Sequence, residues 1–62
     1  MKTLWNYLHT KTLMEQLNFT LYIKGKYADW EKLLEKGIAL LPNDFIKDVT
    51  DYFGITYKDL VN

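Results

Sequence analysis

The sequence predicts an all-α fold, a compact bundle of four to five short helices. The chain has 62 residues, which is room for one domain over residues 1–62 with one core. Apolar residues recur mainly at the spacings of three and four that place them on one face of a helix. Four segments also begin with a threonine, aspartate or asparagine, the residue types that cap helix N-termini.

The first segment is expected to be a short helix from Lys2 to about His9. Its apolar residues share one helical face: Leu4, Trp5 and Leu8. Across residues 10–12 the apolar phase slips, which indicates a break. Thr12 and Glu15 then have the spacing of a capping box, so a second helix should begin there. That helix is expected to bury Leu13, Met14, Leu17 and Leu21.

The end of this second helix is the least determined part of the prediction. Residues 19–23 are aromatic and β-branched, and their alternation fits a strand about as well as a helix. A lone strand needs a pairing partner, and no second strand is evident nearby. Helix is therefore favoured, with an α+β fold containing residues 19–23 as a strand as the alternative. Gly25 is expected to end the segment in either case.

The third segment has the clearest helical pattern. Asp29 can cap a helix whose apolar stripe consists of Trp30, Leu33, Leu34, Ile38 and Leu41. Gly37 weakens the prediction of its last turn. Pro42 should stop this helix, and Asn43 should cap the next one.

The fourth helix is expected to place its apolar residues on one face: Phe45, Ile46, Val49, Tyr52 and Phe53. Gly54 should end it. Thr56 and Asp59 have capping-box spacing and predict a short last helix through Leu60 and Val61.

The composition speaks against an enzyme. The chain has no cysteine and no serine, so the usual nucleophiles and a thiolate metal site are missing. His9 is the only histidine, and a metal site built on it would need carboxylates to complete it. Neither a cofactor nor a metal is expected. Asp44, Asp48 and Asp51 lie on one helical stripe, which we interpret as a solvated face rather than a cation site. With no cysteine, no signal-peptide pattern and no membrane-length apolar run, the cytoplasm is the expected location.

Aromatic residues are unusually frequent. Ten large rings in so short a chain exceed what one small core is expected to hide. Some should lie on the surface, where tyrosine and tryptophan are enriched in binding patches. The candidate partner-binding residues are Trp5, Tyr7, Tyr22, Tyr27, Trp30 and Tyr57. We also expect a small core of this kind to favour a homodimer.

Charge is balanced overall and uneven along the chain. Residues 1–28 contain four lysines and one glutamate, a net charge of +3, and residues 29–62 contain four lysines and seven acidic residues, a net charge of −3. Arginine, which most often reads guanine bidentately, is absent. This composition counts against sequence-specific DNA recognition.

One stretch nevertheless has a DNA-binding pattern. Phe53, Gly54, Ile55 and Thr56 form an apolar-Gly-apolar-Thr turn, with apolar Val49 before it and Leu60 after it. Residues 49–60 resemble the helix-turn-helix of small Cro- and Xre-type phage and bacterial regulators. This resemblance implies a DNA-binding unit at residues 44–62. That region carries four aspartates and two lysines, a net charge of −2, which phosphates would repel.

Two hypotheses for function follow. The favoured one is a small non-enzymatic regulatory or inhibitory protein that acts by protein–protein interaction, with a phage or other mobile element as a candidate source. The alternative is a DNA-binding transcriptional regulator. Its candidate nucleic-acid contacts are Lys2, Lys11, Lys24, Lys26, Tyr57 and Lys58.

Overall fold

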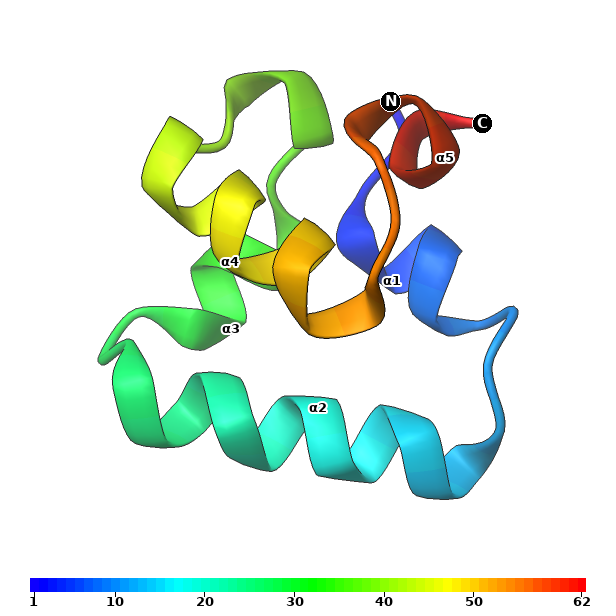
Figure 1. The fold of residues 1–62 in the computed structure, drawn as a ribbon. Coiled ribbons are helices and arrows are strands. Elements are labelled where there is room, and N and C mark those ends of the chain that lie inside the picture. Colours follow the sequence, from blue (N-terminus) through cyan, green and yellow to red (C-terminus); the bar gives the residue numbers. More distant parts are fainter.

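The computed structural model describes residues 1–62 and confirms the all-α bundle. It contains five α-helices and one 3₁₀ turn, η1: α1 (Leu4–Leu8), α2 (Leu13–Lys26), α3 (Trp30–Glu35), η1 (Ile38–Leu40), α4 (Asn43–Phe53) and α5 (Tyr57–Val61). In Figure 1, α2 forms one edge of the molecule, and α1, α3 and α4 all lie on the same side of it. Both chain termini lie on the opposite side from α2, beside α5.

The first helix is shorter than expected. It begins at Leu4 rather than Lys2, with Thr3 at the N-cap, and it ends at Leu8 rather than about His9. The Thr3 backbone N–H donates to Asn6 Oδ1 at 2.7 Å. The chain turns away after Leu8, and the break before Thr12 is confirmed. α1 is short because Thr3 has an extended backbone, which caps the helix and pairs with Gly37.

Residues 19–23 are helical, so the strand alternative is wrong. They lie within the 14 residues of α2, which begins at the expected capping box: the Glu15 N–H donates to Thr12 Oγ1 at 3.1 Å. Gly25 does not end the helix, which continues to Lys26 before Tyr27 leaves it with an extended backbone. A continuous helix satisfies every backbone group of this segment without a second strand, and the chain supplies no such strand.

The expected continuous helix over Trp30–Leu41 is interrupted. α3 ends at Glu35, Lys36 is extended, and Gly37 makes one antiparallel bridge with Thr3. The Ile38 N–H donates to the Lys2 carbonyl at 2.9 Å. Glycine has a low helix propensity, and pairing of residues 37–38 with Lys2 and Thr3 takes the place of helical hydrogen bonds here. Asp29 precedes α3 as expected, but its side chain makes no capping bond.

The corner between α4 and α5 follows local sequence signals. α4 begins one residue earlier than expected, with Pro42 rather than Asn43 at the N-cap. Gly54 ends it with φ 66°, in the left-handed region where only glycine is unstrained. The Thr56 capping box is confirmed, because the Asp59 N–H donates to Thr56 Oγ1 at 3.2 Å.

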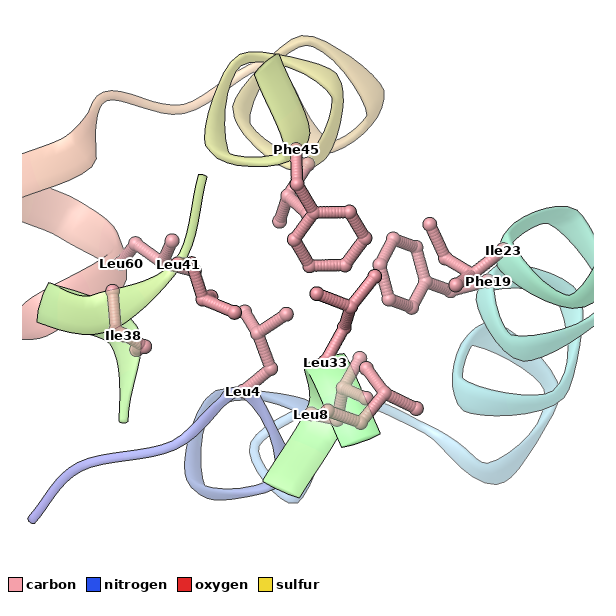
Figure 2. Close-up of a cluster of buried hydrophobic side chains, with 11 residues drawn as sticks. Leu4, Leu8, Phe19, Ile23, Leu33, Ile38, Leu41, Phe45 and Leu60 are labelled. Atoms are coloured by element: carbon pink, nitrogen blue, oxygen red, sulfur yellow. The ribbon is translucent and has the colours of Figure 1, made fainter. Parts of the chain in front are cut away.

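Eleven apolar side chains from every helix and from the segment 38–41 form the core: Leu4, Leu8, Phe19, Ile23, Leu33, Leu34, Ile38, Leu41, Phe45, Val49 and Leu60. Figure 2 shows Phe19 of α2 and Phe45 of α4 pointing into the same interior, which the leucines of α1 and α3 close. These two are the only fully buried rings. The remaining eight rings are half-buried or exposed, as the small core predicts.

Candidate protein-binding surface

Helix α2 has two apolar faces, and only one of them belongs to the core. Phe19 and Ile23 are fully buried. The Phe19 ring packs against the rings of Tyr52 and Phe53, with centroids 5.2 and 4.9 Å away. This inner face holds α2 on the remainder of the domain by burying one large aromatic and one β-branched side chain.

The outer face of α2 contradicts the sequence prediction. Four apolar residues that were expected in the core are exposed, by 83, 65, 54 and 57%: Leu13, Met14, Leu17 and Leu21. These four residues are the outer stripe. At 100° per residue they cover one side of the helix, roughly opposite Phe19 and Ile23.

A physical reason for the error is that α2 lies at an edge and can turn only one side inward. The core selects the side that carries Phe19, because the ring buries more area than a leucine and meets the rings of α4. The sequence held a signal for this outcome: α2 has more apolar residues than one face can hold.

Asp48 of α4 ties α2 to the remainder of the domain. The hydroxyls of Tyr22 and Tyr27 donate to Asp48 Oδ1 and Oδ2 at 2.8 and 2.6 Å. Lys26 Nζ lies 2.8 Å from Asp48 Oδ2 and 3.3 Å from the Tyr22 hydroxyl. The side chain of Asp48 is therefore not on a solvated face, contrary to the sequence interpretation.

These contacts shift the ionisation of their members. The bonds from Lys26, Tyr27 and Tyr22 lower the pKa of Asp48 to about 2. The Asp48 carboxylate in turn raises the pKa of Lys26 above its ordinary range and raises the pKa of the Tyr27 hydroxyl. At neutral pH the ionised Asp48 carboxylate therefore pairs with the Lys26 ammonium group and accepts the two tyrosine hydroxyls, and these contacts hold α2 against α4.

The other end of α2 is held by different contacts. Lys11 Nζ lies over the rings of Tyr7 and Phe53, at 5.1 and 5.5 Å from their centroids. Gln16 Nε2 donates to the Lys11 carbonyl at 3.0 Å. Both ends of the helix are thus anchored, while more than half of each side chain of the outer stripe is exposed.

The predicted aromatic partner-binding residues do not form one patch. Tyr22 and Tyr27 are brought together at Asp48. Trp5 and Tyr7 of α1 and Trp30 of α3 pack partly buried against the core. Tyr57 of α5 is exposed by 45% and borders an apolar hollow of about 340 Å³ that also involves Ile38, Ala39, Leu41, Asn43 and Ile46.

The predicted nucleic-acid contacts are also dispersed. Lys11 precedes α2, and Lys24 and Lys26 lie at the end of α2, so the length of the helix, about 21 Å from its 14 residues, separates them. Lys2 precedes α1, and Tyr57 and Lys58 belong to α5, on the side of the molecule opposite α2 (Figure 1). Lys26 is paired with Asp48. No continuous basic face results.

Other kinds of site find little support in the geometry. No group of three histidine, cysteine, aspartate or glutamate side chains is arranged to hold a metal ion. Asp51 pairs with Lys47 at 3.0 Å, and Asp44 is exposed. None of the helices combines the length and apolar character that a membrane span requires. A polar hollow of about 380 Å³ lies between α2 and the end of α4, lined by Lys11, Glu15, Asn18, Tyr52 and Phe53.

Comparison of the chain with protein-family models, with curated proteins and with solved structures found no match.

Proposed function

We propose that this chain is a non-enzymatic regulatory or inhibitory protein that acts by binding protein through the outer stripe of α2. The single observation that carries the proposal is the exposure of four large apolar side chains on adjoining turns of one helix. Isolated exposed leucines are ordinary, but a contiguous apolar patch on a small protein marks an interaction site.

The anchoring of α2 supports the same function. The capping box at Thr12, the stacking of Lys11 and the bonds to Asp48 hold the helix at both ends. A binding helix that is ordered before contact loses less conformational entropy on association than a flexible one. The outer stripe is thus a rigid, pre-formed surface, of the kind that a groove or another helix can accept.

Electrostatics favours a protein partner over DNA. The helix-turn-helix-like corner at residues 44–62 has a net charge of −2, and its second helix has five residues. The lysines that would have to contact phosphates lie at separate places on the surface. DNA binding needs several cations along one face, because neutralised phosphates supply most of the affinity.

The test is affinity capture from a lysate of the source cells, with and without nuclease, at two salt concentrations. Captured proteins are identified by mass spectrometry and retested as purified components. We expect capture by the wild-type chain to survive nuclease and to be lost in Leu17→Glu. Leu40→Glu, a change at an exposed leucine in η1, is the matched control and should bind normally. Capture abolished by nuclease, or unaffected by Leu17→Glu, would contradict the proposal.

A further inference from the structure

We propose that the outer stripe of α2 binds a second copy of this chain, forming a two-fold dimer of antiparallel α2 helices centred on Leu17. The inference rests on the proposed function, because it names the occupant of the same surface. Its starting observation is the spacing of the stripe. Leu13 and Leu21 each lie four residues from Leu17, one on either side, and all three are exposed.

This spacing makes the stripe complementary to itself. In a two-fold interface the same patch serves both subunits, so residue i of one copy meets residue j of the other and the reverse. With the axis at Leu17, Leu13 of one copy lies against Leu21 of the second, and Leu17 lies against Leu17. Met14 then falls beside Leu21 and Asn18 of the second copy. Every apolar residue of the stripe acquires an apolar neighbour.

The charges around the stripe permit this arrangement. No acidic side chain lies within it: Glu15 is on another side of the helix and is held by Thr12 in the capping box. Lys24 lies on the same side of α2 as the stripe, beyond Leu21, and would come near Lys11 of the second copy. The Lys11 ammonium is turned over the Tyr7 and Phe53 rings, which limits the repulsion. The net charge of zero adds no long-range repulsion between copies.

The size of the surface fits a small dimer. α2 is about 21 Å long from its 14 residues, nearly the 24 Å extent of the molecule, so a second helix can lie along a whole edge. A standard interface buries about 800 Å² per partner, roughly a fifth of the 4223 Å² that this domain exposes. Only one helix of each copy takes part, so we expect the contact to bury less than that area and association to be reversible.

An acidic partner helix fits the surface less well. It would need free cations beside the apolar stripe, yet Lys26 is paired with Asp48 and Lys11 is stacked on rings. Only Lys24 remains close to the stripe. A second copy requires no charge partner and matches the stripe in length, polarity and symmetry.

The two-fold axis gives a specific test. We expect sedimentation velocity and light scattering of the full chain to show a mass rising from monomer to dimer with concentration. Leu17→Glu and Leu17→Lys each place like charges across the axis and should weaken association by about tenfold or more. An equimolar mixture of the two variants should associate more tightly than either alone. Leu40→Glu should dimerise as the wild type does.

Circular dichroism of each variant separates loss of association from loss of folding; we expect the fold to be kept, because Leu17 is 54% exposed and lies outside the core cluster. A wild-type chain that stays monomeric at millimolar concentration would overturn the inference. If that monomer still captured another protein, or bound anionic lipid vesicles, in a Leu17-dependent way, the inference would fail while the function of the outer stripe stood. A dimer unaffected by both Leu17 variants would also overturn it.

Discussion

Helices α2 and α4 are the two longest in the molecule, and they use their apolar residues differently. α4 buries Phe45 and Val49 and turns charged residues outward, among them Asp44, Lys47 and Asp51. α2 buries Phe19 and Ile23 and turns leucines outward. The apolar residues that α4 buries all belong to the core, so the fold explains them. It does not account for the exposed leucines and methionine of the outer stripe of α2, which we propose to bind another chain.

The sharpest test of this difference compares neighbouring residues of α2. Ile23→Ala removes fully buried atoms and should cost about 2–5 kcal/mol. That is a large part of a total stability of roughly 3–9 kcal/mol for a domain of this length. Leu21→Ala removes exposed atoms and should cost less than about 0.5 kcal/mol in the monomer. Urea unfolding at low protein concentration, followed by circular dichroism, measures both. Equal losses would mean that the two faces of α2 are not distinct.

The link between the helices is the next target. Asp48→Asn should cost on the order of 1–2 kcal/mol, because it removes the ionised acceptor of two tyrosine hydroxyls. Asp44→Asn, one turn earlier on α4 and exposed, is the control and should have little effect.

The effect of Asp48 should depend on pH. Its pKa is about 2 in the folded chain and lies below the usual 3.8, so the carboxylate stabilises the fold above about pH 4. That contribution is lost as the pH falls through 2. The stability difference between wild type and Asp48→Asn should therefore shrink between pH 4 and 2. A difference that stays constant over this range would show that the ionised carboxylate is not what ties α2 to α4.

Substitutions at two glycines should have effects of opposite sign. Gly54 ends α4 at positive φ, so Gly54→Ala should cost about 1–2 kcal/mol. Gly25 lies in the last turn of α2 with open space around it, and Gly25→Ala should stabilise the chain by about 0.5–1 kcal/mol. Thermal unfolding of the two variants should shift in opposite directions. A shift of the same sign would contradict the helical assignment of Gly25.

The features that the sequence predicted are those that depend on neighbours along the chain. The capping boxes at Thr12 and Thr56 and the glycine stop at Gly54 each involve residues within a few positions of one another. They determine where helices begin and end. The all-α class follows from them and from the helical apolar spacing.

The features that the sequence did not predict depend on distant residues. Asp48 meets Tyr22 across 26 positions of the chain, and Gly37 pairs with Thr3. The choice between the two faces of α2 depends on which side meets Phe53 and Tyr52 of α4. Local periodicity placed Leu13, Leu17 and Leu21 on a common face correctly, but it cannot say whether that face turns inward. The candidate site was missed for this reason.

The most direct test of the antiparallel α2 contact uses the absence of cysteine from the chain. Leu13→Cys and Leu21→Cys are prepared singly and exposed to mild oxidant, alone and mixed in equal amounts. The two-fold arrangement brings position 13 of one copy next to position 21 of the other, and it leaves like positions about 12 Å apart by the helical rise. The mixture should therefore form a mixed disulfide faster than either variant joins to itself. If the mixture and each variant alone formed disulfides at the same rate as a Leu40→Cys control, the arrangement would be contradicted.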